Sequence, residues 1–420
     1  MASTAAFASA ARDRDGISVS PSLARLPFLL AGIGGLGALI GMLVPGLQKQ
    51  FCFSWLMAFM FYLSLMLGGL FLVILHHLFD AQWSVPIRRI TEHLGCSAPI
   101  IAVFFLPILG NALLAGPEKA IFQWMHVDPA HDHALSAKAS LFNKPAWVLV
   151  SLAVLTVWFL LTTALRKASL DQDKTGSVDC TRRLRFLSAL GIFLFAITLT
   201  LGAILWMKSL QWQWFSTMYG VYYFAGSVWL TLATVYVIAL YLKKLGPLAN
   251  VVQPVTFHDN GKLFFAFTVF YAYIAFSQYF LIWNANIPEE TFWYVLREKG
   301  SWWSVGMLMI FGHFFLPFLL LLRIDTKMSF TVMVPLAIWA WLMHFCDLSF
   351  NIMPVLHPDG FVIHWLDVAC MAFMGGVMAL WFIRNFNAHP PFPQRDPRMA
   401  ECLGIHIPPS GGSKSHGGAH

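Results

Sequence analysis

Ten stretches of about 20 predominantly apolar residues recur along this chain, and each is long enough for a helix to cross the hydrocarbon core of a membrane. Charged residues make up only 11% of the chain, against roughly 25% in an ordinary soluble domain. Because lipid offers no hydrogen-bond partners to an exposed backbone, such segments fold as helices. We therefore predict an all-α, polytopic membrane protein with spans near 26–47, 54–78, 95–115, 146–166, 184–206, 217–242, 262–284, 302–322, 329–350 and 362–384.

The ten spans form one predicted transmembrane domain, residues 26–385, between two tails. Residues 1–25 contain charged residues but no apolar region of their own, so we expect an N-terminal tail and no cleaved secretory signal. Residues 386–420 mix Pro and Arg and end in SGGSKSHGGAH, which is typical of a disordered tail. The His residues of this tail are also potential metal ligands, but the composition favours flexibility.

Basic residues predict the orientation of the chain, because Lys and Arg are retained on the cytoplasmic side of short loops. Most of the 27 Lys and Arg residues fall on one side when the tails and alternate loops are grouped together, and the loop from Arg166 to Arg185 is the richest. We expect both termini in the cytoplasm, which agrees with an even number of spans. The net charge of +7 then indicates loops near anionic lipid rather than a nucleic-acid partner.

The sequence carries no signature of a bound metal or redox centre. Its six cysteines include no CxxC or CxxCH spacing, and Walker, HExxH and Gly-rich dinucleotide motifs are missing. A bis-histidine haem needs two imidazoles at similar depth, and His313 has no obvious partner at its own depth. We predict no cofactor held by this chain, so electrons that move nearby belong to another subunit or to a diffusible carrier.

Five ionisable residues lie inside the apolar stretches. Such groups are costly in hydrocarbon, so they usually face the interior of a helical bundle and serve a pathway. His313 is the deepest of them, roughly 16 Å into the eighth span at 1.5 Å per residue. The five are His313, His344, Asp347, His364 and Asp367.

Following the chain direction separates the ionisable residues into two sets at opposite faces. The set expected at the inner face comprises His76, His77, Asp80, Arg88, Arg89, Glu92 and His93. The set expected near the outer face comprises His344, Asp347, His357, Asp359, His364 and Asp367. The predicted proton-pathway candidates are His76, His77, Asp80, Glu92, His93, His313, His344, Asp347, His364 and Asp367.

The motifs HFCD (344–347) and HWLD (364–367) place His and Asp on the same face of each helix. A carboxylate beside an imidazole raises its proton affinity, so each pair is a possible proton relay. Structural roles stay open for both sets, because side chains near span ends reach water at little cost. His313 could likewise serve only as a hydrogen-bonding group between helices.

Three segments resemble one known family. They are YAYIAFSQYFLIWNANIPEETFWYVLREKGSWW (271–303), GHFFLPFLLLLR (312–323) and GGLFLVILHHLFDAQWSVPIRRITE (68–92). The chain is similar to the ActF membrane protein of alternative complex III, a bacterial quinol:cytochrome c (or other periplasmic acceptor) oxidoreductase. This family is related to the NrfD-like membrane anchors of polysulfide reductases. The likeness extends over most of the chain but not over the tails or the 117–144 loop.

The resemblance implies two four-helix bundles flanked by extra helices, in a complex of the bacterial inner (plasma) membrane. It implies partner subunits that carry the electrons: an iron–sulfur protein, c-type cytochromes with haem c, and a sister NrfD-like subunit. This chain would add a quinone-like pocket, a proton route or support. Among the residues in the matching segments, the quinone-pocket candidates are Gln278, Asn284 and His313.

Two other classes of protein stay possible from the sequence. A secondary transporter also places ionisable groups at mid-membrane and commonly breaks its helices at corresponding positions of two repeats. Pro317 and Pro335 interrupt spans here, but no paired pattern is evident. A non-catalytic membrane scaffold, whose polar groups only dock partners, is the second alternative.

Overall fold

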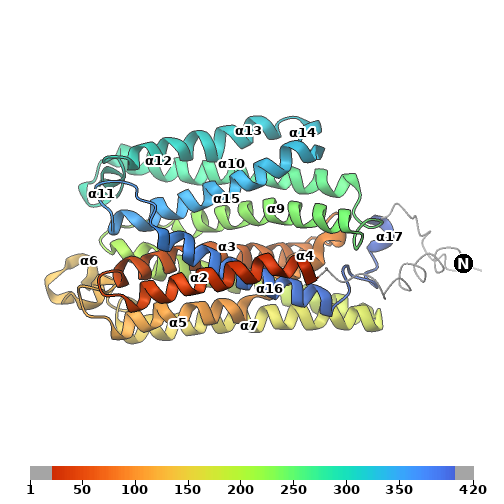
Figure 1. Cartoon of the computed structure of the whole chain (residues 1–420), viewed down its shortest axis with the longest axis horizontal. Coiled ribbons are helices and arrows are strands. Elements are labelled where there is room, and N and C mark those ends of the chain that lie inside the picture. The colour runs from red at the N-terminus through yellow and green to blue at the C-terminus, as the bar shows by residue number, and fades with distance from the viewer. Residues whose placement is uncertain (1–20, 403–420) are drawn as a thin grey trace, which may run out of the picture.

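The computed structural model describes residues 21–402, and within this range the chain is helical and contains no strand. Ten helices or helix series in the described part are long and apolar enough to cross a membrane, and they lie side by side (Figure 1). The predicted all-α, ten-span polytopic fold is therefore confirmed. Residues 1–20 and 403–420, which include most of the predicted N-terminal tail and the final His-containing stretch, lie outside the described residues.

Eight of the ten spans are single long helices. They are α2 (Arg25–Leu43), α3 (Gln48–Leu78), α7 (Lys144–Thr175), α8 (Val178–Trp206), α9 (Tyr219–Leu245), α10 (Pro254–Ala285), α15 (Phe330–Ile352) and α16 (Trp365–Ala388). The other two spans are composite. One joins η3 (Val85–Ile87), α4 (Arg88–Gly95) and α5 (Ala98–Leu114), and the other joins α12 (Trp302–Leu308), the π-helical η7 (Met309–Phe315) and α13 (Leu316–Leu321).

Short helices lie at the two ends of the bundle. They are η2 (Pro21–Ala24), η4 (Gln123–His126), η5 (Pro129–His131), α6 (His133–Ser136), η6 (Lys208–Gln211), α11 (Pro288–Arg297), α14 (Ile324–Met328), η8 (Met353–Val355) and α17 (Met399–Cys402). We call the end with α4 and α17 the tail face and the opposite end, with α6 and α11, the α11 face (Figure 1). Both ends of the described chain lie at the tail face.

Several helices extend well beyond the apolar windows from which they were predicted. The expected loop from Arg166 to Arg185 is almost entirely helical, because α7 continues to Thr175 and α8 begins at Val178. Gly176 stops α7 with a left-handed φ of 66°, and the Ser177 side chain accepts a hydrogen bond from the N–H of Asp179. The predicted loop was too long, because charged side chains end an apolar window of the sequence but do not end a helix.

The spans form two groups of four around a shared interface. Helices α3, α5, α7 and α8 contact one another in a closed ring, and α9, α10, the α12–α13 series and α15 form a second ring. The rings meet where α3 and α8 pack against α9, while α2 and α16 pack as a flanking pair against α3. Helix α3 is the centre of the molecule, since 94% of its most apolar window is buried.

Glycines bring the flanking helices α2 and α16 into close contact. A Cβ atom on Gly34 of α2 would lie 2.4 Å from the backbone nitrogen of Phe373, and one on Gly376 of α16 would lie 2.5 Å from the backbone of Ala31. Close approach of backbones at small residues is the usual way in which membrane helices associate. The α2–α16 pair therefore depends on the lack of a side chain at these two positions.

The structure overturns part of the predicted disordered tail. Helix α16 continues to Ala388, and the segment after it folds back against the tail face and ends in α17. Asp396 and Arg398 in this segment are buried, with 4% and 7% of their surface exposed. A polar, Pro-rich segment is ordered here because its charges pair with the bundle, which composition alone does not reveal.

Candidate functional site

Three clusters of buried polar side chains lie along the central helix α3. The tail-face network surrounds Glu92, the central polar group surrounds Asp347 and His313, and the α11-face cluster surrounds Asp367. Helix α3 contributes His76 and His77 to the first, Ser64 to the second, and Ser54 and Gln50 to the third. The predicted division into two sets at opposite faces is thus refined to three levels.

Glu92 is the centre of the tail-face network. Its carboxylate lies 3.2 Å from Arg88 Nε, 2.6 Å from Arg89 Nη1 and 3.0 Å from Arg166 Nη1, and it also accepts a hydrogen bond of 2.6 Å from the Ser169 hydroxyl. All five side chains are at least nine-tenths buried as residues. One carboxylate shared by three guanidinium groups binds α4 to α7 and is held as an anion by them.

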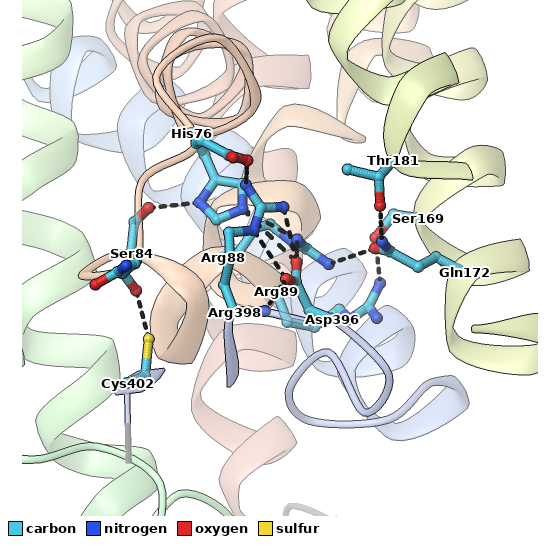
Figure 2. Close-up of polar contacts among 12 residues, drawn as sticks. His76, Ser84, Arg88, Arg89, Ser169, Gln172, Thr181, Asp396, Arg398 and Cys402 are labelled. Atoms are coloured by element: carbon cyan, nitrogen blue, oxygen red, sulfur yellow. Dashed lines mark hydrogen bonds and ion pairs between the residues drawn. The ribbon is translucent and has the colours of Figure 1, made fainter. Parts of the chain in front are cut away.

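Asp396 joins the C-terminal segment to the same network (Figure 2). It pairs with Arg88, and both of its oxygens contact Arg398, at 2.9 and 3.0 Å. Arg88 Nη1 also lies 3.0 Å from Nε2 of His76, whose Nδ1 lies 2.6 Å from the Ser84 hydroxyl. Burial alone would raise the pKa of Asp396, but the His76 hydrogen bond and the positive charges of Arg88 and Arg398 hold it well below its usual range.

The structure brings the remaining inner-face candidates to the edge of this network. Asp80 is about half exposed, with a left-handed φ of 54°, and it pairs with Arg185 and, at 2.7 Å, with Arg398. His93 Nδ1 lies 3.1 Å from a guanidinium nitrogen of Arg166. The ring nitrogens of His77 are buried and have no hydrogen-bond partner within residues 21–402. The predicted gathering of these side chains at one face is therefore correct.

Asp347 is the centre of the central polar group. Its carboxylate is 3% exposed and accepts hydrogen bonds from the Tyr222 hydroxyl and, at 3.1 Å, from Asn351 Nδ2. The Tyr222 hydroxyl lies 2.7 Å from that of Tyr271, and Asn351 Oδ1 accepts a bond of 3.0 Å from the Tyr219 hydroxyl. Three tyrosines, one amide and one carboxylate thus form a continuous hydrogen-bonded series of groups with exchangeable protons. The series runs from Tyr271, in the middle of α10, to Tyr219, the first residue of α9, on the side of the α11 face.

His313 lies in the middle of the bundle between two aromatic rings. The ring centroids of Trp229 and Tyr271 are 3.9 and 3.8 Å from that of the imidazole, both tilted by 20°. The side chain is fully buried, and neither ring nitrogen has a hydrogen-bond partner in the described part of the chain. It is carried by the π-helical segment Met309–Phe315, and single π-helical turns within α-helices occur frequently at functional sites.

His344 and Asp347 lie on the same side of α15, as the HFCD spacing predicts, but they bind different groups. His344 Nε2 lies 3.0 Å from the Ser64 hydroxyl, which is 3.2 Å from that of Tyr223. His344 Nδ1 has no partner among residues 21–402. A Cβ placed on Gly226 would lie 3.4 Å from this nitrogen and 3.6 Å from Asp347 Oδ2, so this glycine borders the space between the two side chains.

The HWLD motif has a structural use at the start of α16. The Asp367 carboxylate accepts a hydrogen bond of 2.9 Å from the backbone N–H of His364, while His364 Nδ1 accepts one of 3.2 Å from the N–H of Leu366. These reciprocal bonds form a capping box. His364 and Asp367 therefore orient the helix terminus, an alternative to the predicted relay.

Asp367 also contacts the beginning of α3. Its Oδ1 accepts hydrogen bonds from the Ser54 hydroxyl and, at 3.4 Å, from Gln50 Nε2. Gln50 Oε1 lies 2.8 Å from Nε2 of His357. The α11-face cluster thus links the α15–α16 connection to α3, with Asp367 only 2% exposed.

The three quinone-pocket candidates do not meet at one place. Gln278 is buried, accepts a bond of 2.6 Å from the Ser216 hydroxyl and donates one of 3.2 Å to the Tyr294 hydroxyl. Asn284 is exposed and donates to the carbonyl of Phe280 in its own helix. Only His313 lies deep in the bundle, so the structure does not assemble Gln278, Asn284 and His313 into a common pocket.

Sequence reasoning missed the neutral polar residues and several charged ones. Tyr222 and Tyr271 lie in apolar runs, where tyrosine is common and does not mark a site. Asn351 follows Asp347 by four residues, so the i, i+4 rule pointed to it. Arg166 was assigned to a loop and Asp396 to a disordered tail, so neither was considered as a partner for Glu92 or Arg88.

The fold and the buried ionisable groups together define a multi-pass α-helical membrane protein with clusters of polar side chains in an otherwise apolar interior. Comparison with protein-family models finds no match to this chain, and comparison with curated proteins finds none either. Within residues 21–402, no group of three or more His, Cys, Asp or Glu side chains is arranged to hold a metal ion.

Proposed function

We propose that this chain is an integral membrane component of a respiratory quinol:acceptor oxidoreductase of the alternative complex III type, in which it provides a route for protons. The resemblance of three segments to the ActF protein of that complex supports the choice of system. In this proposal the chain lies in a bacterial inner membrane with its tail face in the cytoplasm. Iron–sulfur and haem c subunits carry the electrons, and a sister NrfD-like subunit lies beside it.

The single observation that carries the proposal is the buried hydrogen-bonded series centred on Asp347. Oxidation of a quinol releases two protons with its two electrons, and a base must accept each proton for the reaction to proceed. A carboxylate bonded to Tyr222 and Asn351, with Tyr271 and Tyr219 at either side, offers such a base and a path toward the α11 face that ends at the buried Tyr219. Ionisable groups in this position commonly mark proton relays.

The arrangement favours proton release at the α11 face over transfer across the whole membrane. Ser64 and His76, the nearest polar members of α3 in the central group and the tail-face network, are roughly 18 Å apart along the helix. The α3 side chains between them are apolar, apart from two glycines. Passage through this region requires water, whereas the series from Tyr271 to Tyr219 is already hydrogen-bonded.

The proposal is tested with Asp347→Asn in the assembled complex. The amide keeps the shape and an acceptor oxygen but does not accept a proton, so we expect quinol turnover coupled to proton release to fall on the order of tenfold or more. Asp367→Asn is the matched control, because that carboxylate is equally buried but caps α16. Turnover with quinol and acceptor, together with proton release from proteoliposomes, is the measurement.

Two results would contradict the proposal at different points. Unchanged turnover and proton stoichiometry in an intact Asp347→Asn complex would remove the proton route. Purification of the chain in mild detergent without any haem-containing or iron–sulfur partner would remove the assignment to the complex and leave a transporter as the better description.

A further inference from the structure

A groove of about 450 Å³ opens at the tail face, beside the tail-face network, with which it shares Arg166. It lies where α5 begins, between α7 and α16, and its inner walls include Pro99, Thr162 and Trp381. Trp381 is held in place by a hydrogen bond of 3.3 Å from its indole nitrogen to the carbonyl of Cys96. The outer part of the groove is lined by charged residues of α7.

The charge at this groove is positive. Arg166, Lys167 and Lys174 line it, together with one carboxylate, Asp171. Lys167 and Lys174 are exposed, and no ion pair joins either to a described residue. The groove therefore has an excess of positive charge at the end where α7 leaves its apolar region.

The network behind the groove does not neutralise Arg166 fully. Its only acidic partner within residues 21–402 is Glu92, which is already shared with Arg88 and Arg89. Within the described chain, five arginines of this network face four carboxylates, namely Arg88, Arg89, Arg166, Arg185 and Arg398 against Asp80, Glu92, Asp173 and Asp396. An anion in the groove would complete the charge balance.

An exposed apolar track continues from the groove toward the middle of the bundle. Val103 and Leu106 follow Pro99 at one and two turns of α5 and are 57% and 58% exposed. Leu160 precedes Thr163 by one turn of α7 and is 59% exposed. The cationic end of the groove is followed by the apolar track, just as the charged headgroup of a phospholipid is followed by its acyl chain.

We propose that this groove binds a phospholipid whose headgroup carries a net negative charge, such as a phosphatidylglycerol. The phosphate lies among Arg166, Lys167 and Lys174, and an acyl chain follows the track between α5 and α7. Basic pockets between membrane helices commonly bind anionic headgroups in this way. A free phosphate ion uses only the charged end, so the apolar track favours the lipid.

The test is a lipid titration of the full chain in mild detergent, followed by native mass spectrometry. Phosphatidylglycerol and phosphatidylcholine of equal chain length are compared for the natural protein and for the double variant K167Q/K174Q. The control is K243Q/K244Q, which removes the same charge from the end of α9 at the same face. Both lysines of the test variant are exposed, so folding is expected to be retained and is checked by helical content.

We expect phosphatidylglycerol to bind more tightly than phosphatidylcholine, and K167Q/K174Q to weaken it on the order of tenfold while the control is unchanged. Equal binding of the two lipids, or an unaffected K167Q/K174Q variant, would overturn the proposal. Full displacement by millimolar inorganic phosphate would assign the site to a free anion instead. Protection of both lysines from chemical labelling by a bound protein partner, in delipidated sample, would assign it to a protein interface.

Discussion

At the scale of single residues, polarity within apolar sequence was an accurate guide to burial but a weak guide to role. His313, Asp347 and Asp367 all lie inside the bundle, at 0%, 3% and 2% exposure. Their uses differ: one is stacked between rings, one is hydrogen-bonded to tyrosine, and one caps a helix. An ionisable residue within an apolar stretch indicates that a costly group is buried. The role of that group depends on the partners that distant helices supply.

The salt bridges of Asp396 give a prediction at this scale. Replacing this buried carboxylate removes an anionic partner of Arg88 and Arg398, which keep only Glu92 and Asp80, so Asp396→Asn should release the segment after Ala388 at a cost of about 3–5 kcal/mol. Limited proteolysis with mass spectrometry should then show cleavage after Ala388 that the natural protein resists. Asp325→Asn, in an exposed pair with Arg323, is the control and should change little.

The pH dependence of this contact follows from the lowered pKa of Asp396. A carboxyl whose folded pKa lies below its unfolded value stabilises the fold fully above the unfolded value, about pH 4, and loses this effect as the pH falls further. Protection of the segment should therefore be the same at pH 7 and pH 5 and decline only in stronger acid. Release between pH 7 and pH 5 would show that another group controls the contact.

At the scale of helices, the apolar windows predicted correctly that each membrane-spanning helix exists, but they predicted poorly where each helix begins and ends. All ten predicted spans are present, but α7 runs nine residues past its window and α10 begins eight residues before it. The ends depend on local stops such as Gly176 and on pairing of charged side chains, which hydropathy does not measure. The π-helical segment around His313 was also not predicted, because an apolar window records composition and not the hydrogen-bonding pattern of the backbone.

The contact between α2 and α16 gives a prediction at this scale. Leu at Gly34 would overlap the backbone of Phe373, so Gly34→Leu should separate the two helices and lower stability by at least about 1–3 kcal/mol. Gly32→Leu is a matched control two residues away, because a Cβ atom added at Gly32 would have no neighbouring atom within 4 Å. Thermal unfolding in detergent should show a lower midpoint for Gly34→Leu and no loss for Gly32→Leu. Equal midpoints would mean that α2 is not held by this crossing.

At the scale of the whole molecule, the sequence predicted the fold class and the number of spans, but not the path of the C-terminal segment. The two four-helix groups and the flanking pair were expected only from the family resemblance, and the helix contacts agree with that arrangement. Chain connectivity and an even number of spans place both described ends at one face. The pairing of helices in the core depends on shape complementarity between side chains of different helices. A single apolar window of the sequence carries no information about that complementarity.

Orientation in the membrane is the prediction for the whole molecule. If the tail face is cytoplasmic, a cysteine at Lys244 should react with an impermeant maleimide only in inverted vesicles, and one at Asp128 only in spheroplasts. Both positions are exposed: Lys244 lies in the last turn of α9, at the tail face, and Asp128 caps η5, next to α6 at the α11 face. Peptide-level mass spectrometry separates these labels from the native cysteines. The reverse pattern would place the proposed proton exit in the cytoplasm.

The burial of α3 on all sides has a consequence for biogenesis. This helix is synthesised second among the ten, yet its companions α9 and α15 are made much later. Until they arrive, Ser64 must remain in lipid or in the insertion machinery without Tyr223 and His344, the partners that α9 and α15 supply in the finished protein. The nascent chain therefore passes through a state in which its future centre is its outer surface, and this is the stage at which assembly factors or early neighbours matter most.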